Sequence, residues 1–279
     1  MTETLASFSR DGLTFDLIDQ GPRDGEVVVL LHGWPQLNTC WDEVASQLNA
    51  SGYRTIAPNQ RGFAMGARPR RRYAYRLSEL VADIEALVDT LGAPVHLVGH
   101  DWGAAIAWAT AAEHPDKIRT LTALSVPHPG AFLKAMPRGQ IRESWYMAAF
   151  NIPRLPELIL GNPARARMAL QVKAKMPAHA FEAYLRDFVG VPERLRNCFG
   201  YYRALPFSGT RALRPVAVPT TYIWSDDDVA LTRVGADLCA DYVTADYRFE
   251  IVPGASHWLP DEQPKEVARL IEERVRGDR

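Results

Sequence analysis

The chain has 279 residues, which is enough for one large α/β domain or a core with an insertion, and enough to fold without disulfides or metals. Its formal net charge of −1 excludes a global field that would recruit nucleic acid or an anionic membrane. The three cysteines are odd in number and far apart, which argues against a disulfide framework or a zinc site and favours a cytoplasmic protein. The first residues lack the apolar stretch of a secretory signal, and no apolar run reaches the ~18 residues of a membrane span.

The first half of the chain alternates predicted strands with predicted helices. Residues 13–21 alternate apolar and polar side chains like a half-buried strand, whereas 26–35 is a continuous apolar run, typical of a strand buried on both faces. Residues 76–92 form the clearest amphipathic helix, and Ser78 is its predicted N-cap. The other expected elements are helix 41–52, strand 53–62, strand 94–99, helix 102–114 and strand 118–126. This alternation predicts βαβ crossovers and a mostly parallel central sheet with helices on both faces.

The alternation stops near residue 128. From there to about 214 the sequence is rich in Pro, Arg, Met, Tyr and Phe, with short helical stretches and no clear strand. It resumes with strand 218–228, helix 233–243, strand 247–254 and helix 264–277. We therefore expect an α/β core made of residues 1–128 and 215–279, interrupted by a helical cap at 129–214.

A strand-like run ends in Gly99-His100-Asp101-Trp102-Gly103, and a predicted helix follows at once. The spacing is that of a nucleophile elbow, G-x-S-x-G, with Asp101 in the place of the serine. In an open parallel sheet, catalytic groups gather beyond the carboxyl ends of the strands, which is where Asp101 is expected. An isolated aspartate at such a turn is more simply interpreted as a helix N-cap.

Three other segments favour a catalytic interpretation. "LLHGWP" is a buried strand that ends beside the elbow, so the backbone amides of Trp34 and Trp102 could together form an oxyanion hole. His257 lies in a loop after a late strand, and the acids 226–228 follow the strand before it. The chain order of nucleophile, acid and histidine is that of α/β hydrolases.

Together these segments resemble the α/β-hydrolase superfamily and, more narrowly, its epoxide hydrolase and haloalkane dehalogenase branch, whose nucleophile is aspartate. His32-Gly33-Trp34-Pro35 is similar to the HGxP motif of that branch, and residues 99–103 to its elbow. Ser256-His257-Trp258 is similar to its histidine motif, with Ser256 for the usual glycine. The resemblance covers about residues 10–128 and 215–275. It implies an α/β-hydrolase fold with a helical cap.

The cap residues favour the epoxide hydrolases within this branch. That family carries two cap tyrosines, the second before an arginine, and "CFGYYRALPF" offers Tyr202 before Arg203. Gly200 stands where the family usually has Asn, and the neighbouring Tyr201 is an alternative to Tyr202. The segment "ESWYMAAF" resembles that of the first tyrosine and indicates Tyr146. Simple packing is the other interpretation of both tyrosines.

The resemblance implies a role for each residue. Asp101 would attack an sp³ carbon to form an alkyl-enzyme ester, while Tyr146 and Tyr202 donate protons to the epoxide oxygen. His257 would act as the general base that activates water for ester hydrolysis. Family spacing from Ser225 indicates Asp228 as the acid that orients His257. Asp226 and Asp227 are the alternatives.

Several questions stay open at this point. A haloalkane or haloacid dehalogenase on the same core is the main alternative. Haloalkane dehalogenases usually have Asn or Glu after the His-Gly pair, whereas this chain has Trp34. Fluoroacetate dehalogenases usually have Arg after the nucleophile, whereas this chain has Trp102. A non-catalytic ligand-binding homologue is a third hypothesis. The histidines lack metal-ligand spacing and no Gly-rich phosphate loop occurs, so no cofactor or metal is expected. The expected partners are a small apolar epoxide and water. The identity of the epoxide, the selectivity and a possible homodimer are undecided.

Overall fold

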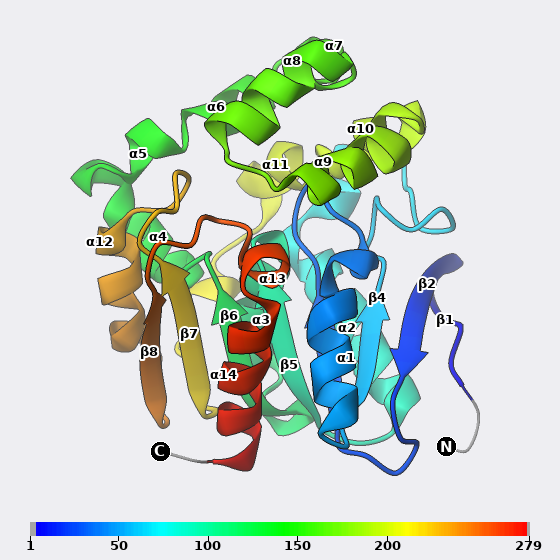
Figure 1. Cartoon of the computed structure of the whole chain (residues 1–279), viewed down its shortest axis with the longest axis vertical. Coiled ribbons are helices and arrows are strands. Elements are labelled where there is room, and N and C mark those ends of the chain that lie inside the picture. The colour runs from blue at the N-terminus through cyan, green and yellow to red at the C-terminus, as the bar shows by residue number, and fades with distance from the viewer. Residues whose placement is uncertain (1–3, 278–279) are drawn as a thin grey trace.

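The computed structural model describes residues 4–277, which form one eight-stranded sheet in the order β1-β2-β4-β3-β5-β6-β7-β8 (Figure 1). The β1–β2 and β2–β4 pairs are antiparallel and all other pairs are parallel. The strands are β1 (Ser7–Arg10), β2 (Leu13–Gln20), β3 (Val27–Leu31), β4 (Arg54–Pro58), β5 (Val95–His100), β6 (Ile118–Leu124), β7 (Thr220–Ser225) and β8 (Tyr247–Val252). The expected mostly parallel sheet is confirmed. Only β1, a short edge strand, was not expected from the sequence.

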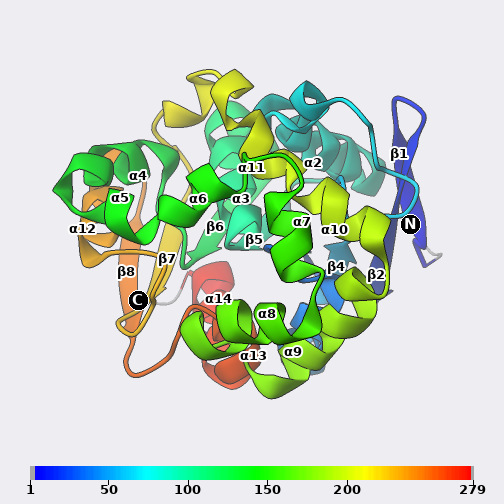
Figure 2. The same ribbon diagram turned by 90° about the horizontal axis from the view of Figure 1, so that it is seen from above.

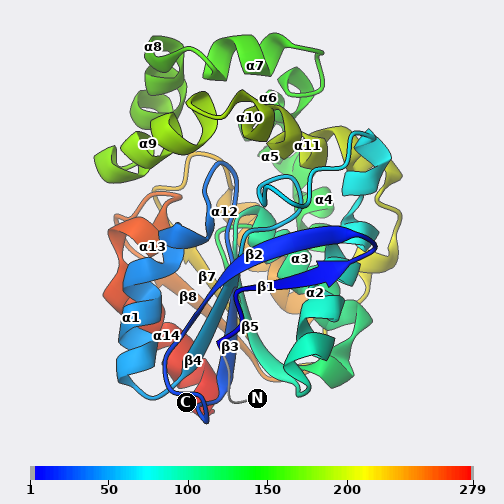
Figure 3. The same ribbon diagram turned by 90° about the vertical axis from the view of Figure 1, so that its right-hand side faces the viewer.

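Helices cover both faces of the sheet, as Figure 3 shows edge-on. One face carries α1 (Asp42–Ala50) and α14 (Pro264–Arg276), and the other carries α2 (Leu77–Leu91) and α3 (Trp102–Glu113). Successive side chains of a strand point to opposite faces, so β3 contributes to both cores. Val28 and Leu30 pack in the cluster with α1 and α14, and Val29 and Leu31 in the cluster with α2 and α3. The prediction of a strand buried on both faces is therefore confirmed.

A run of short helices between β6 and β7 lies above the carboxyl ends of the parallel strands (Figures 1 and 2), and we refer to this segment, residues 129–214, as the cap. Its first helix, α4, packs beside α12 of the core (Figure 1), and its Ala135 approaches Gly235 there. The α-helices are α4 (Pro129–Ala135), α5 (Gln140–Glu143), α6 (Trp145–Ala149), α7 (Leu155–Leu160), α8 (Pro163–Ala166), α9 (Ala178–Tyr184), α10 (Pro192–Cys198) and α11 (Gly200–Ala204). Two π-helices, Arg167–Lys173 and Leu185–Val189, complete the run.

Two local predictions need correction. Helix α2 begins at Leu77, so Ser78 lies inside it and is not the N-cap. A 3₁₀ turn, Arg72–Tyr75, leads directly into this helix. The backbone amide of Leu77 donates a hydrogen bond of 3.2 Å to the hydroxyl of Ser208 in the cap. The expected helix 233–243 is α-helical only in α12 (Arg233–Asp237) and continues as a 3₁₀ helix. Helix α13 (Leu259–Glu262) follows the histidine loop.

Across residues 4–277, none of the helices has both the length and the apolar character that crossing a bilayer requires.

Candidate active site

Asp101 sits on the turn between β5 and α3 with a strained backbone, φ 52° and ψ −117°. Such a conformation lifts the side chain out of the sheet, but it brings the strand and helix backbones very close together. A Cβ at Gly99 would lie 2.2 Å from the carbonyl oxygen of Gly103, and a Cβ at Gly103 would lie 2.1 Å from that of Leu31. The two glycines are therefore required by space, as the sequence pattern predicted.

The two carboxylate oxygens of Asp101 face different groups. Oδ1 accepts a hydrogen bond of 2.7 Å from the backbone amide of Trp34, and Oδ2 lies 3.5 Å from Nε2 of His257. The side chain is almost fully buried, which by itself would raise its pKa. The His257 and His100 rings and the Trp34 amide outweigh the burial, so the pKa of Asp101 is lowered and the carboxylate stays ionised. The site thus holds a charged aspartate with one oxygen bound by an amide and the other directed toward the histidine.

Of the three consecutive acids, only Asp228 reaches the histidine. Its Oδ2 lies 2.8 Å from Nδ1 of His257, and its Oδ1 accepts the amides of Ala230 and Leu231 at 2.7 and 3.0 Å. These bonds fix the carboxylate, and the carboxylate in turn fixes the plane of the imidazole ring.

The other two acids of this loop, Asp226 and Asp227, bind partners away from His257. Asp226 accepts the amide of Gly254 at 2.7 Å, and Asp227 forms an ion pair of 2.5 Å with Lys175 of the cap. Neighbouring acids on one short loop point in different directions, so the sequence alone left the choice open.

His257 lies between two carboxylates, Asp101 and Asp228. Burial alone would lower the pKa of His257, but the charges and hydrogen bonds of Asp228 and Asp101 raise it to about 10. The ring is therefore an imidazolium at neutral pH as long as Asp101 carries its negative charge.

Asp228→Asn is expected to reduce turnover about 10⁴-fold, because the amide cannot stabilise the imidazolium and favours the wrong ring tautomer. Asp226→Asn and Asp227→Asn are the matched controls, and each should keep turnover within about threefold of the wild type, because neither side chain touches His257. Steady-state turnover of the three variants checks this. A control that loses as much activity as Asp228→Asn would contradict it.

The raised pKa of His257 also predicts how stability depends on pH. Because the folded pKa lies above the ordinary 6.5, the stabilising contribution is complete below pH 6.5 and is lost as the pH rises toward 10. The free energy of unfolding in urea, measured from pH 6.5 to 9.5, should fall more steeply for the wild type than for His257→Gln. A difference between the two proteins that stays constant over this range would show that no such coupling exists.

The structure brings Tyr146 and Tyr202 together on the cap side of the site. Their ring centroids lie 6.2 Å apart, and Tyr202 packs edge-on against Trp34 and Trp102 at 5.8 and 5.1 Å. Burial raises the pKa of both phenols, and the charge of Asp101 raises it further in each case. The two phenols therefore remain protonated.

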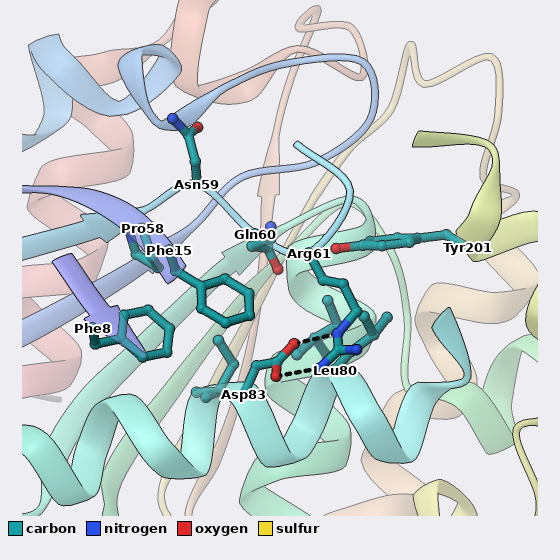
Figure 4. Close-up of a pocket in the computed structure, with 11 residues that line it drawn as sticks. Phe8, Phe15, Pro58, Asn59, Gln60, Arg61, Leu80, Asp83 and Tyr201 are labelled. Atoms are coloured by element: carbon teal, nitrogen blue, oxygen red, sulfur yellow. Dashed lines mark hydrogen bonds and ion pairs between the residues drawn. The ribbon is translucent and has the colours of Figure 1, made fainter. Parts of the chain in front are cut away.

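Tyr201 points the other way. Its ring packs against Trp102, Phe63 and Tyr75 at 5.2, 5.5 and 6.2 Å, but Figure 4 shows its hydroxyl directed toward Arg61, on the side of the Arg61–Asp83 ion pair. Of the two neighbouring tyrosines, only Tyr202 contacts Tyr146.

Gly200 stands where epoxide hydrolases usually have Asn, and the structure gives a steric reason for the glycine. A Cβ there would lie 2.6 Å from the ring of Tyr75, so no larger residue fits while that ring is buried beneath α11. Gly200 and Tyr75 thus form a matched pair.

Sequence reasoning missed the groups that hold the histidine loop. The carbonyl of His257 accepts hydrogen bonds from Nε2 of His100 at 2.8 Å and from the hydroxyl of Ser125 at 3.1 Å. Glu262 accepts the amide and the hydroxyl of Ser256 at 2.7 and 2.8 Å. The available signal was weak: His100 and Ser125 each stand at the carboxyl end of a buried strand, where site residues gather.

His32 supports the loop that carries the Trp34 amide. Its Nδ1 bonds the carbonyl of Gly33 at 3.0 Å, and its Nε2 accepts the amide of Gln60 at 3.1 Å. His32 therefore holds this loop in place from both of its ring nitrogens.

An aspartate elbow, an acid–histidine pair and a cap on a mostly parallel sheet define a hydrolase of the α/β type. The sequence profile of the alpha/beta hydrolase family matches residues 28–270, so the chain belongs to this family.

Individual relatives narrow the assignment. The chain is 33% identical to epoxide hydrolase 3 of Xenopus tropicalis, and the match covers 96% of this chain and 76% of the relative. It is 29% identical to epoxide hydrolase A of Mycobacterium tuberculosis, and that match covers 96% of this chain and 95% of the relative. A solved epoxide hydrolase from metagenomes of hot environments superposes with a TM-score of 0.85 at 28% identity, covering 99% of both chains. Within the alpha/beta hydrolase family, these relatives and this solved structure are epoxide hydrolases. The resemblance to epoxide hydrolases that the sequence motifs indicated is therefore confirmed.

Proposed function

We propose that the protein hydrolyses a small apolar epoxide to a vicinal diol through a covalent ester on Asp101. The names of its relatives support the reaction class. The observation that carries the proposal is the pair of phenols, Tyr146 and Tyr202, whose rings lie 6.2 Å apart, with Tyr202 packed edge-on against Trp102, the residue next to Asp101. A nucleophile and two acids are the groups that epoxide opening requires.

In the first half-reaction, the Oδ2 atom of Asp101 attacks an epoxide carbon and the carbon–oxygen bond of the ring breaks. The released oxygen takes a proton from the phenol of Tyr146 or Tyr202, while the second phenol donates a hydrogen bond to it. The product is a hydroxyalkyl ester of Asp101. Phe150 and Phe199 pack around Trp34 with ring centroids 5.0 and 5.7 Å away, which supports an apolar substrate.

In the second half-reaction, water attacks the carbonyl carbon of the Asp101 ester. Forming the ester removes the charge of Asp101, which is one of the causes that raise the pKa of His257. The pKa of His257 therefore falls once the ester has formed, so the ring can release its proton to the phenolate that the first half-reaction left and can then act as a base. His257 then takes a proton from the attacking water, with Asp228 stabilising the imidazolium. When the tetrahedral intermediate collapses, the diol oxygen leaves with the proton of the new Asp101 carboxyl group, which restores the carboxylate.

The tetrahedral intermediate of this step needs donors for its oxyanion. The Trp34 amide already binds Oδ1 of Asp101 in the free protein at 2.7 Å, which supports Oδ1 as the oxyanion position. We assign the Trp102 amide, at the N-terminus of α3, as the second donor. Losing one such donor typically raises the barrier by about 2.7–4 kcal/mol.

Dehalogenation on the same site is disfavoured by the donors present. A halide leaves as a stable anion and needs no proton, so two phenols have no purpose there. The indole N–H of Trp34 is bonded to the sulfur of Cys198 at 3.1 Å and is not directed at a leaving group. The test is a panel of small epoxides, including styrene oxide, beside one haloalkane. Diol formation without halide release supports the proposal, and halide release without diol would overturn it.

Tyr202→Phe is expected to lower epoxide turnover by about 10- to 100-fold, because Tyr146 remains as a single donor. Tyr201→Phe is the matched control: it removes the same hydroxyl one residue away, on the side of Arg61, and should stay within about threefold of the wild type. The double variant Tyr146→Phe/Tyr202→Phe should lose about 10³-fold or more. Single-turnover rates check this, and equal losses at positions 201 and 202 would contradict it.

We also propose that residues 129–214 act as the cap that covers the bound epoxide, and that the protein works in a reducing compartment such as the cytoplasm. Cys40, Cys198 and Cys239 are free thiols, which supports the second point.

A further inference from the structure

Charge is segregated along this nearly neutral chain. Residues 129–214 hold 14 Lys and Arg but only five Asp and Glu, a formal net charge of +9. The remaining residues hold 18 Lys and Arg and 28 Asp and Glu, a net charge of −10. The overall value of −1 therefore hides a strongly basic cap on an acidic core, and an electrostatic argument from net charge alone does not apply to the cap.

The basic residues share one part of the cap with exposed apolar side chains. We call the exposed side chains of residues 138–175 the outer cap face. This segment includes α6, α7 and α8, which lie farthest from the sheet in Figures 1 and 3. Its large apolar side chains are about half or more exposed: Ile141, Trp145, Ile152, Leu158, Met168 and Val172. Its exposed cations are Arg138, Arg142, Arg154, Arg165, Arg167, Lys173 and Lys175, against only Glu143 and Glu157.

Most of these cations are not neutralised by the protein itself. Lys175 pairs with Asp227, and Arg167 lies over the ring of Phe181. Within the described residues, Arg138, Arg142, Arg154, Arg165 and Lys173 have no ion-pair partner. The outer cap face thus presents apolar side chains together with unpaired positive charge, a combination that is typical of proteins that bind the surface of an anionic bilayer.

We propose that the outer cap face docks on an anionic phospholipid surface, with Trp145 and its apolar neighbours at the headgroup level and the cations on the lipid phosphates. Aromatic and aliphatic side chains supply burial at the interface, and Lys and Arg supply attraction to negative headgroups. The docking is peripheral and requires no membrane-spanning segment.

Charge disfavours a second copy of the chain as the partner. A symmetric dimer would bring the same patch of each copy together, so two faces of net charge +5 would oppose one another. Nucleic acid would match the charge but would leave six exposed apolar side chains without a role. An anionic bilayer matches both features.

The position of the outer cap face also suits the proposed epoxide hydrolysis. Only this part of the proposal depends on that function. In α6, Trp145 is exposed while its neighbour Tyr146 packs inward against Phe150 and Tyr202. A docked bilayer would therefore lie directly above the proton donors. Apolar epoxides concentrate in lipid, so docking would bring the enzyme to its substrate.

The test measures vesicle binding without substrate, so its outcome is independent of turnover. Trp145 is 66% exposed, whereas the other six tryptophans are at most 9% exposed, so a change in tryptophan emission on binding reports on Trp145. Vesicles of phosphatidylcholine with 30% phosphatidylglycerol should shift the emission to the blue, and brominated lipid should quench it. Pure phosphatidylcholine should give a much weaker signal, and raising the salt concentration should weaken the binding.

Three multiple-substitution variants separate the contributions of the cations and of the apolar side chains to vesicle binding. Arg138→Gln/Arg165→Gln/Lys173→Gln should lower the partition coefficient by about 100-fold, since each of the three cations near an anionic surface contributes about fivefold. Arg119→Gln/Lys265→Gln/Arg269→Gln makes the same charge change on the exposed core and should bind like the wild type. Met168→Ser/Val172→Ser should also lose binding, by about tenfold or more, because it removes apolar contact at the same face.

Four results would overturn the proposal. These are no binding to anionic vesicles, an equal loss in the core control, a solution dimer that buries Trp145 without lipid, and binding of duplex DNA that depends on the cations but not on Met168 and Val172. Circular dichroism and thermal unfolding of each variant confirm that a loss of binding does not come from a loss of fold.

Discussion

Asp101→Asn is expected to reduce epoxide turnover by about 10⁴-fold or more, because it removes the nucleophile and no other group can form the ester. The variant should fold normally. Asparagine is nearly the same size, it tolerates the positive φ of this turn, and its Oδ1 can still accept the Trp34 amide. Diol formation under saturating substrate, together with urea unfolding of both proteins, measures the two effects separately.

Asp226→Asn is the control for Asp101→Asn, because it makes the same chemical change on an exposed loop acid that accepts the Gly254 amide and does not contact His257. The Asp101→Asn sample is checked by mass spectrometry for deamidation, which would restore the aspartate. Turnover above about 1% of the wild type in a sample that still carries the substitution would mean that Asp101 is not the nucleophile.

Labelled water distinguishes attack by Asp101 from direct attack by water. In a single turnover in H₂¹⁸O, the oxygen that reaches the diol comes from Asp101, so the diol should be unlabelled and the label should appear in the peptide that contains Asp101. Label in the diol of the first turnover would show that water attacks the epoxide directly.

His257→Gln is expected to stop the reaction at the ester and to reduce steady-state turnover by about 10⁴-fold or more, because no base remains to activate water. The first half-reaction uses Asp101 and the phenols, so it should survive. Intact mass should rise by one substrate mass per chain, and peptide mapping should locate the adduct at Asp101. The reaction is best run at pH 8 to 9, since removing the imidazolium removes a cause that lowers the pKa of Asp101.

His179→Gln is the control for the trapping experiment, because His179 is an exposed cap residue that lies beside Asp261 and not beside Asp101. It should release diol at the wild-type rate and accumulate no adduct. A His257→Gln protein that neither turns over nor gains mass would argue against a covalent ester.

The sequence by itself determined the parallel sheet, the core and the two residues, Asp101 and His257, that we propose as nucleophile and base. Asp101 and His257 stand in short contiguous motifs, and the elbow depends on glycines two residues to either side, so local pattern is sufficient to find them. Strands buried on both faces and amphipathic helices produce periodic patterns for the same reason: each element must bury its apolar side chains.

Only the tertiary structure decided which member of a run of similar residues faces the site. Asp228 and not Asp226 or Asp227 meets His257, and Tyr202 and not Tyr201 meets Tyr146, because side-chain direction depends on how a loop bends and how a short helix is rotated in packing. The supporting groups His100, Ser125 and Glu262 come from separate elements that only the fold brings together. The same holds for the outer cap face, since net charge is a sum over the chain, whereas binding depends on where the charges lie.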